Sequence, residues 1–459
     1  MRRLKNVTIR GLLGRFNHSI DFPEDWEFII LHGPNGVGKT RFLEVIQNTY
    51  LFRPHVLADL PFQNVSFSFS DGSVLEVNKI RQQSLPKEGA DGTPTQGDPP
   101  ILRYVLSGIE SVPIHWNLLQ QPSERVNPAR VRQIEQYLPI EQIGPDLWLD
   151  QRTGEYMSMR EVIDRYTDEL PFDTGEREKA PESLRKFLKD LDVHLIETQR
   201  LVTFDPATGA PARPGRRPPQ RATVNRFAED LTNQIRGALA RNSRTAQELD
   251  RTFPRRVLSQ STPHTVTDEQ IRARYEVQSE LRRRLAEIAV LDSSAEMTLP
   301  DRTLEDWERS VLWTYLEDSE KKLATFQTLL NRVQLLREVV NSRFLFKELR
   351  IDAEKGFRFV TDTGEELLPH QLSSGEQHEL VLIYDLLFTV KANSLVLVDE
   401  PEISLHIAWQ QQFLNDIQRI AELSDLQFII ATHSPQIIHN WWNRAVALYS
   451  DPTRPPFQA

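Results

Sequence analysis

The chain has 459 residues, with 55 Lys and Arg against 65 Asp and Glu and a formal net charge of −10. It contains no cysteine, which excludes disulfides, a thiol nucleophile, an iron–sulfur cluster and a cysteine-based zinc site. No apolar run approaches the roughly 18 residues of a membrane span, and we expect a cytoplasmic protein. The length predicts two or three domains, or one domain with a large insertion. The net acidity argues against a surface that binds nucleic acid over its whole area, but it does not exclude local basic patches.

A glycine-rich loop near the N-terminus is the most informative segment. The first residues alternate in polarity and predict a strand, and an apolar run over 27–32 predicts a second, buried strand. The sequence GPNGVGKT follows at 33–40 and leads into a predicted helix over 41–50, which is the strand, loop and helix setting that the G-x-x-x-x-G-K-T pattern requires. Backbone N–H groups of such a loop wrap a phosphate chain. Lys39 is expected to reach the β- and γ-phosphates and Thr40 to hold Mg²⁺; an ordinary glycine turn is the alternative.

The next segment predicts β structure. Apolar and polar residues alternate over 65–69 and 74–77, on either side of a turn at Asp71 and Gly72, which indicates a half-exposed antiparallel hairpin. A loop rich in Gly, Pro and charge is predicted at 86–100.

Residues 111–190 are predicted to be mainly helical, as an inserted lid or docking surface. The predicted helices cover three ranges, 131–138, 159–170 and 181–191. An apolar strand from Val193 then ends in Gln199 and Arg200.

The most basic part of the chain is 200–260, where 12 Arg stand against 5 acidic residues. Its first part, rich in Pro and Gly, is predicted to be disordered because it cannot pack a core. Four arginines in it are candidates for contact with DNA phosphates or with an acidic protein: Arg213, Arg216, Arg217 and Arg221. A solvated loop is the alternative.

From about residue 267 to 344 the apolar residues recur at spacings of three, four and seven, which predicts helices. One unbroken helix over 304–345 would be about 60 Å long at 1.5 Å per residue. With a partner helix over 271–291 it would form a short antiparallel arm.

Two features at the C-terminal end complete the pattern. The run LSSGEQ at 372–377 heads a predicted helix over 376–390, with Ser373 or Ser374 as its cap and an acidic or amide residue in the first turn. Because it lies between the glycine loop and the acidic residues that follow, we interpret it as one of an ordered set of motifs and not as a helix cap alone.

The acidic residues come at the end of an apolar run. Residues 395–398 predict an interior parallel strand that ends in Asp399 and Glu400, at the edge where open α/β sheets bind ligands. Asp399 is expected to bind Mg²⁺, and Glu400 to act as the general base that polarises the attacking water. A second buried strand over 426–431 leads to His433, a candidate sensor of the γ-phosphate. Two solvated acids and a structural histidine are the alternatives.

In chain order, GPNGVGKT, LSSGEQ, LVLVDEP and ATHSP resemble the Walker A, signature, Walker B and switch-histidine motifs of ABC-type ATPases. Their form is closest to the soluble SMC, RecF and OLD-like branch, and the resemblance covers about residues 1–80 and 350–450. It implies an α/β fold: an ABC-type P-loop ATPase head, with a mixed sheet flanked by helices, an antiparallel β subdomain, and a helical insertion that forms a short coiled-coil arm. The arm is much shorter than an SMC coiled coil, and it has no cysteine hook.

We therefore expect five parts: lobe I with Walker A and the β subdomain (1–110), a helical insertion (111–192), a return strand with a candidate Q-loop (193–202), the basic loop and arm (203–349), and lobe II with the signature, Walker B and switch histidine (350–459).

The resemblance implies ATP and Mg²⁺ as cofactors, with ATP held between two heads so that each nucleotide meets the signature residues Ser374 and Gly375 of a second copy. The implied nucleotide contacts in Walker A are Gly33, Asn35, Gly36, Gly38, Lys39 and Thr40, the implied metal ligands are Thr40 and Asp399, and the implied catalytic residues are Glu400 and His433.

Two positions depart from the family pattern. The family's Q-loop glutamine has no motif strong enough to place it, and the candidate is Gln199, for which a plain strand end is the alternative. His406 stands where the family often has Asp, which leaves Asp-mediated communication between the two nucleotide sites in doubt.

OLD-like ATPases of this size without a nuclease of their own resemble the ATPase subunits of bacterial anti-phage systems, among them those of PARIS, Septu and retron systems. The resemblance implies a homo-oligomeric scaffold or sensor that holds a TOPRIM-type nuclease or toxin until a phage-encoded trigger protein is sensed, without a membrane partner. The alternative is a RecF-like ATPase of DNA repair, which the basic segment favours and the net acidity and short arm oppose. A transporter subunit is disfavoured, because it has no counterpart to the long helical excursion.

Overall fold

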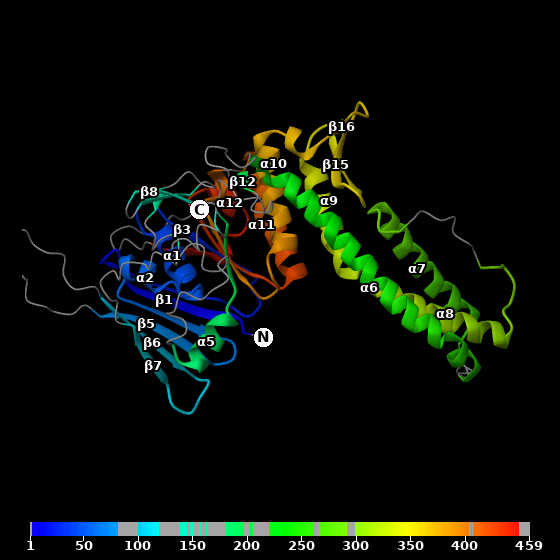
Figure 1. Cartoon of the computed structure of the whole chain (residues 1–459), viewed down its shortest axis with the longest axis horizontal. Coiled ribbons are helices and arrows are strands. Elements are labelled where there is room, and N and C mark those ends of the chain that lie inside the picture. The colour runs from blue at the N-terminus through cyan, green and yellow to red at the C-terminus, as the bar shows by residue number, and fades with distance from the viewer. Residues whose placement is uncertain are drawn as a thin grey trace, which may run out of the picture. The chain divides into compact units, whose positions relative to one another are not determined.

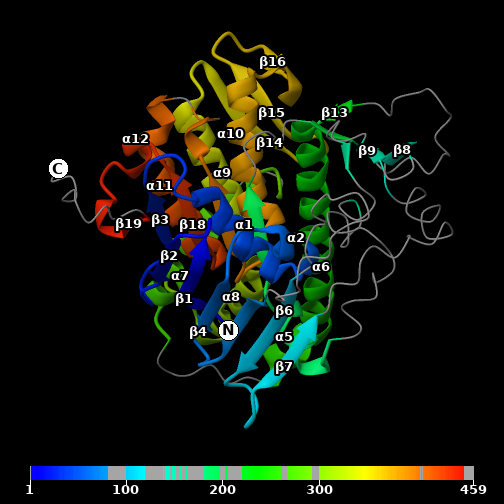
Figure 2. The same ribbon diagram turned by 90° about the vertical axis from the view of Figure 1, so that its left-hand side faces the viewer.

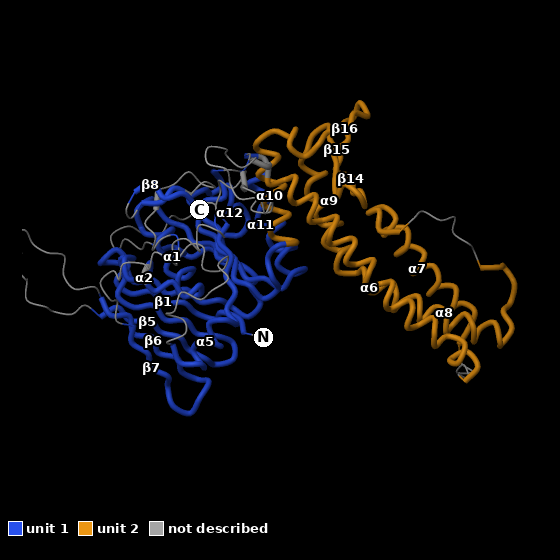
Figure 3. The backbone as a smooth tube through the Cα atoms, in the orientation of Figure 1, with its two compact units in different colours: residues 1–221, 389–459 blue, residues 222–388 orange. Residues whose placement is uncertain are grey.

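The computed structural model describes residues 2–80, 100–118, 138, 140–144, 147–150, 156–157, 162, 180–196, 202–204, 220–259, 266–291, 299–403, 405 and 407–448. The chain forms two compact units, the first from Met1–Arg221 with Thr389–Ala459 and the second from Ala222–Phe388 (Figure 3). The first unit thus joins both ends of the chain. The expected division placed residues 350–388 with lobe II, whereas their contacts group them with the arm.

An antiparallel sheet of six strands forms one layer of the first unit, in the order β2-β1-β4-β5-β6-β7 (Figure 1). Its strands are β1 (Leu4–Leu12), β2 (Phe16–Asp21), β4 (Asn64–Phe69), β5 (Val74–Ile80), β6 (Ile101–Ser107) and β7 (Ile114–Leu118). Along β4, Val65, Phe67 and Phe69 are buried and the residues between them are half-exposed, so one face of the sheet packs on a core. The predicted β4–β5 hairpin is confirmed, with Val65 opposite Val77.

A second sheet in the same unit is entirely parallel, in the order β11-β17-β18-β3-β19. Its strands are β3 (Phe28–His32), β11 (Val193–Ile196), β17 (Leu395–Asp399), β18 (Gln427–Thr432) and β19 (Ala445–Ala447). The strands β3, β17 and β18 are buried almost throughout, as expected for strands covered on both faces. All three were predicted from their apolar runs, and their carboxyl ends lie at one edge.

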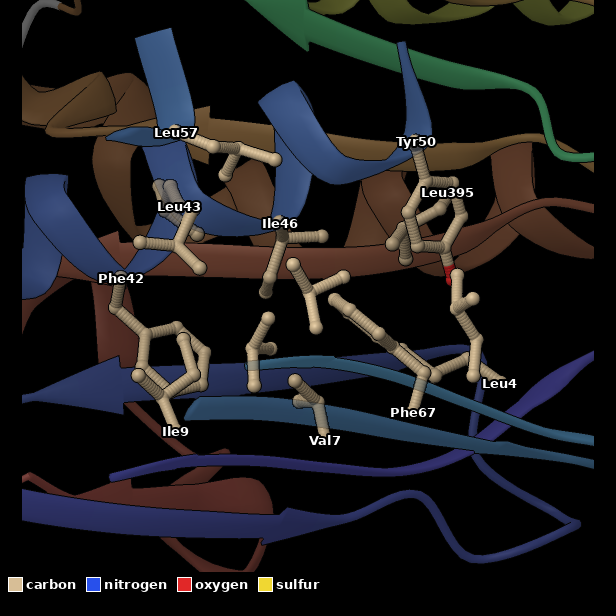
Figure 4. Close-up of a cluster of buried hydrophobic side chains, with 14 of the residues drawn as sticks. Leu4, Val7, Ile9, Phe42, Leu43, Ile46, Tyr50, Leu57, Phe67 and Leu395 are labelled. Atoms are coloured by element: carbon tan, nitrogen blue, oxygen red, sulfur yellow. The ribbon is translucent and has the colours of Figure 1, made fainter. Parts of the chain in front are cut away.

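Helix α1 (Lys39–Tyr50) packs in the core between the two sheets. Its buried side chains Phe42 and Ile46 lie toward Ile9 and Val7 of β1, in the same cluster as Leu395 of β17 (Figure 4). Figure 2 shows α1 and α2 (Pro54–Asp59) over the antiparallel sheet, where α2 contacts β6. Full burial of each such side chain stabilises the fold by about 1.5–3 kcal/mol, so this layer holds the glycine loop on a rigid support.

The second unit is mostly helical. Its helices are α6 (Thr223–Ser259), α7 (Asp268–Glu287), α8 (Asp306–Ala324), α9 (Gln327–Arg343) and α10 (Ser374–Tyr384), and its small sheet has the order β14-β15-β16 from β14 (Lys347–Asp352), β15 (Gly356–Thr361) and β16 (Glu366–Leu367). Helix α8 packs against both α6 and α7, which gives the expected coiled-coil-like arm.

Charged side chains link the helices of the arm. Arg256 of α6 donates two hydrogen bonds to the buried carboxylate of Asp318 on α8. Arg274 of α7 pairs with Glu320 of α8, and its guanidinium lies 4.3 Å from the ring centre of Trp313. These pairs fix the helices side by side around a small apolar cluster.

The stretch 304–345, considered above as one unbroken helix, forms two helices, because α8 and α9 are separate. At the break a side chain from another helix intervenes: Asn242 of α6 donates to the Lys322 carbonyl (2.8 Å) and to the Thr325 hydroxyl (3.2 Å). It thereby satisfies a carbonyl at the end of α8, and the buried Phe326 is the N-cap residue of α9.

Helix α6, of 37 residues, begins at Thr223 inside the basic part of the chain, where no helix was predicted. The predicted helical insertion is wrong for most of its described residues. Strand β7 pairs with β6, and β8 (Ile140–Gly144), β9 (Leu147–Asp150) and β10 (Tyr156–Met157) form a three-stranded sheet. Helix α5 (Glu182–Lys189) confirms the third predicted helix, and most of the other two lies outside the described residues.

The remaining elements are β12 (Val202–Phe204), β13 (Gln220–Ala222), η2 (Pro369–Gln371), the π-helical η3 (Asp385–Thr389), η4 (Pro401–Ile403), α11 (Ile407–Ser424), α12 (Pro435–Ile438) and η5 (Trp442–Arg444). Of the helices in the described ranges, none is both long enough and apolar enough to cross a membrane.

Candidate nucleotide-binding site

The loop between β3 and α1 leaves the start of α1 without a side-chain cap. Gly38 is the N-cap residue, with φ +91°, and no described side chain accepts a hydrogen bond from the first turn. A Cβ at Gly38 would lie 3.0 Å from the Leu12 side chain, in a backbone conformation that glycine alone adopts readily. The first N–H groups of α1 are therefore available to an anion.

Lys39 is the buried cation of this loop, with 6% of its surface exposed. Its Nζ donates to the Gly33 carbonyl at 2.9 Å and to the Pro34 carbonyl at 3.4 Å. Burial lowers the pKa of the neighbouring His32, and the positive charge of Lys39 lowers it further. The loop thus folds around one ammonium group, as a phosphate-binding loop requires.

Asp399, at the end of β17, accepts a hydrogen bond from the hydroxyl of Thr40 at the start of α1. Its Oδ1 is buried and has no hydrogen-bond partner among the described residues. Burial raises the pKa of Asp399, as does the charge of Glu400, whereas the Thr40 hydrogen bond and Lys39 act in the opposite direction. A buried, under-coordinated carboxylate beside a hydroxyl fits a hard divalent cation.

Mg²⁺ would be held here by Thr40 and Asp399. No cluster of three or more His, Asp or Glu in the described ranges has the arrangement of a metal site, so its other ligands would be phosphate oxygens and water, which is usual for Mg²⁺.

Glu400 and His433 meet at the same sheet edge. Asp399 pairs with Ala431 in the ladder between β17 and β18, and the Glu400 N–H donates to the Ala431 carbonyl at 2.9 Å. Glu400 has φ +45°, an uncommon backbone conformation for a residue with a side chain. The His433 Nδ1 lies 3.4 Å from Glu400 Oε1, so the two predicted catalytic residues are neighbours.

The structure adds a residue to this group that was not among the predicted site residues. Glu402, in η4, lies 3.0 Å from His433 Nδ1 through its Oε1. The same oxygen accepts the Thr432 hydroxyl (2.8 Å) and the His433 backbone N–H (3.0 Å), while Oε2 is buried without a partner among the described residues. The only signal in the sequence was its place in the run Asp-Glu-Pro-Glu at 399–402.

Most predicted residues of Walker A, Walker B and the switch motif therefore come together. Asn35 and Gly36 lie exposed in the same loop. Gln199 and His406 lie outside the described residues, as do Arg213, Arg216 and Arg217, and the side chain of Arg221 is not described.

The signature residues Ser374 and Gly375 begin helix α10 in the second unit. Ser373 is the N-cap: its hydroxyl accepts from the Glu376 N–H, and the Glu376 carboxylate accepts the Ser373 N–H at 2.9 Å. Lys347 donates to the same carboxylate at 2.7 Å. Ser374 is exposed, and no atom lies within 4 Å of a Cβ built on Gly375. The start of α10 is thus preformed and open.

A family model described as "AAA domain, putative AbiEii toxin, Type IV TA system" matches residues 219–439. The match includes the arm, the signature, Walker B and the switch histidine, and it begins after the glycine loop.

Two curated relatives match shorter parts. "Retron Ec83 probable ATPase" of Escherichia coli is 28% identical over 164 residues, which is 33% of this chain and 29% of that protein. "Protein ea59" of Escherichia phage lambda is 30% identical over 120 residues, 26% of this chain and 23% of that protein. The chain thus spans less than a third of the length of each of these relatives.

Among solved structures, the Smc head domain of Pyrococcus furiosus with an extended coiled coil, bound to the C-terminal domain of ScpA, covers 96% of this chain and 92% of its own, at 11% identity and a TM-score of 0.32. The SMC head domain from Thermotoga maritima gives 11% identity, a TM-score of 0.30, and coverage of 96% and 92%. These TM-scores are low.

The functional assignment rests on the site and the family match. A glycine loop at an uncapped helix, a lysine inside it, and a threonine bonded to the aspartate of a parallel strand are the parts of a P-loop site. The chain therefore carries a P-loop ATPase domain, formed by both ends of the chain, and a second unit of long helices, which is the arrangement that the resemblance predicted.

Proposed function

We propose that this chain is the ATP-hydrolysing scaffold or sensor subunit of a bacterial anti-phage system, which controls a separately encoded toxin or nuclease through ATP-dependent pairing of two heads. The observation that carries the ATPase part is the hydrogen bond from Thr40 to Asp399. It joins residues far apart in the sequence at one magnesium and phosphate position.

Head pairing is supported by two helix starts among the described residues that are suited to bind an anion. These are α1, with its uncapped glycine start, and α10, with Ser374 exposed in its first turn. A triphosphate bound at α1 still presents γ-phosphate oxygens outward, and the α10 terminus of a second copy has the hydroxyl and N–H groups to receive them. ATP would then link two copies and hydrolysis would release them.

The defence role is supported by the similarity to the retron ATPase. The proposal has three further parts, which are the oligomeric state, the effector and the trigger. We propose a homo-oligomer that holds a TOPRIM-type nuclease or toxin until a phage-encoded protein is sensed, in the manner of the PARIS ATPase AriA.

The pairing is tested with Glu400→Gln, which keeps the shape of the side chain and removes the base. We expect hydrolysis to fall by about 10²–10⁴-fold and the ATP-bound protein to sediment as a larger species than the nucleotide-free protein. The matched control is Glu422→Gln on the exposed face of α11, which should behave as the wild type. An unchanged sedimentation profile with ATP would contradict the pairing.

The defence role is tested by affinity purification from the native host before and during phage infection, with mass spectrometry of co-purifying proteins. We expect a smaller nuclease or toxin to be bound before infection and released afterwards, with hydrolysis indifferent to DNA. A DNA-stimulated ATPase that retains no effector would contradict the proposal.

A DNA-binding ATPase of repair is the second candidate, and one observation favours it. Arg241, Arg244, Arg251 and Arg255 are exposed on α6, and within the described residues none of them has an ion-pair partner. At about 100° per residue they fall on one side of the helix, within about 80° of one another. Such a row matches a line of phosphates.

This candidate is tested by changing the four arginines together to glutamine and measuring duplex DNA affinity against salt. If the row binds DNA, affinity falls and the salt dependence becomes shallower, since each lost phosphate contact releases one counterion fewer. The control is Arg283→Gln on α7, because Arg283 already pairs with Glu280 and Glu287. An unchanged salt slope would remove the support that this row gives to the candidate.

A further inference from the structure

Glu402 is a buried carboxylate whose Oε1 accepts two hydrogen bonds from the end of β18, one from the Thr432 hydroxyl at 2.8 Å and one from the His433 backbone N–H at 3.0 Å. The ring nitrogen Nδ1 of His433 lies 3.0 Å from the same oxygen. The side chain is 8% exposed, so it has little contact with water and depends on these contacts. The contacts tie the turn after Walker B to the switch histidine.

The ring contact bears on which nitrogen carries a proton. A carboxylate oxygen and an unprotonated ring nitrogen repel each other at 3.0 Å, so this separation favours a proton on Nδ1. In a neutral imidazole the partner of one nitrogen decides the state of the other. A neutral His433 ring with its proton on Nδ1 has its lone pair on Nε2.

Glu400 lies farther from the same nitrogen, at 3.4 Å against 3.0 Å for Glu402. The structure thus separates two carboxylates that the sequence places two residues apart. Glu402 makes the closer ring contact and also holds the backbone of His433, which leaves the oxygens of Glu400 to the attacking water.

We infer that Glu402 is a positioning residue for His433: it keeps the ring proton on Nδ1 and fixes the ring relative to Glu400. The inference rests on the proposed function only for its effect on hydrolysis. The state of the ring is a property of the protein without nucleotide. In the neutral ring, Nε2 is then the nitrogen left to accept a proton or a hydrogen bond from a water or ligand.

The ring state is measured by NMR on the full chain, with deuterated protein and labelled histidine, at a pH where the ring is neutral. The ring ¹⁵N and ¹³Cδ2 shifts distinguish the two tautomers, and His433→Gln assigns the signal by its loss. We expect the proton on Nδ1 in the wild type and in Glu402→Gln, whose amide oxygen still accepts. In Glu402→Ala the proton should move to Nε2.

Three comparisons separate this role from a structural one. Thr432→Val removes another donor to the same oxygen and should leave the tautomer unchanged. Glu400→Ala should also leave it unchanged, because Glu402 makes the closer contact. If Glu402→Ala does not fold, Glu402→Leu fills a similar volume and carries the same expectation. A proton on Nε2 in the wild type, or a shift caused by Glu400→Ala and not by loss of Glu402, would overturn the inference.

Hydrolysis provides the second readout. Loss of Glu402 should lower kcat more than tenfold with the KM for ATP changed less than twofold, and Glu402→Gln should restore most of kcat. Equal kcat values for the alanine and glutamine variants would contradict a positioning role. A chain that does not hydrolyse ATP at all would refute the proposed function while leaving the NMR result to decide the inference.

Discussion

Two helix N-termini of this molecule, those of α1 and α10, satisfy their first N–H groups in different ways. Helix α1 begins at Gly38 in a left-handed conformation with no described side chain capping it, whereas α10 begins at Ser373 with a complete capping box and a lysine on the capping glutamate. The first N–H groups of α1 are left for a ligand, whereas the capping box of α10 already accepts part of its first N–H groups when no ligand is bound.

Under the proposed pairing of two heads, the difference predicts which helix start depends on nucleotide. An uncapped helix start is stabilised when an anion binds it, so the glycine loop should gain order with ATP. The backbone at the start of α10 should be equally ordered with and without nucleotide, as we expect of a surface that binds the nucleotide of another copy. The predictions below test the two termini against each other.

The largest effect is expected from Lys39→Ala in the α1 loop. Removing the buried ammonium takes away the group that meets the β- and γ-phosphates, and loss of one partner in a buried charge pair costs about 2–5 kcal/mol. We expect ATP affinity to fall by at least about 100-fold in calorimetric titration. Lys391→Ala is the control, since that lysine is 76% exposed and pairs with Asp192. Equal ATP affinity in both variants would remove Lys39 from the site.

The next effect compares a glycine from each terminus. Gly38→Ala puts a side chain into a left-handed backbone 3.0 Å from Leu12, so both stability and ATP binding should fall. Gly375→Ala lies in a helix with open space around it, so stability should stay within about 1 kcal/mol of the wild type and single-chain ATP binding should not change.

Gly375→Ala should also affect the ATP-dependent pairing with a second copy. In a Glu400→Gln background, Gly375→Ala should weaken the ATP-dependent larger species in sedimentation, because the added methyl group lies where a partner's phosphate would approach. If Gly375→Ala pairs as well as its parent, α10 is not the surface that receives the nucleotide.

The sequence predicted the parallel strands and the site at their ends because each feature is local. A run of buried residues such as Val396–Val398 predicts an interior strand, and the acid that follows it must lie at the carboxyl edge. The contact between Thr40 and Asp399 could be predicted because the two motifs have known places on such a sheet. Glu402 could not, because nothing local indicates that its oxygen meets Thr432 and His433.

The arm was predicted less well, for a physical reason. The apolar positions of α6, at Val224, Phe227, Leu231 and Ile235, have helical spacing, but no helix was predicted there, because this stretch was interpreted through its arginines and the Pro-rich segment before it. At the break between α8 and α9 the chain contacts Asn242 of another helix, which no local pattern shows.

A smaller effect separates the two neighbouring serines of α10. Ser373→Ala removes the N-cap and should destabilise α10 by about 1 kcal/mol, seen as faster hydrogen exchange of its amides. Ser374→Ala should leave that exchange unchanged, because Ser374 is exposed and does not cap the helix, and it should weaken only the ATP-dependent pairing. The reverse assignment, with Ser374 controlling exchange, would mean that the helix starts one residue later than described.

The smallest effect is expected from Lys347→Met, which removes the lysine from Glu376. Burial raises the pKa of Glu376, but hydrogen bonds from Lys347 and Ser373 outweigh it and hold the pKa below its ordinary value of 4.5. A carboxyl with a lowered pKa contributes stability that is fully present above about pH 4.5 and is lost as the pH falls through the folded value.

Hydrogen exchange of the α10 amides, corrected for the intrinsic rates, should therefore show the wild type more protected than Lys347→Met at pH 7, by less than about 1 kcal/mol. The difference should shrink as Glu376 takes up its proton. Arg350→Met is the control, because its partner Glu348 is exposed and lies away from the cap. A difference that stays constant down to pH 3 would mean that Lys347 supports α10 by packing alone, and the self-capped start of α10 would then rest on Ser373 without help from charge.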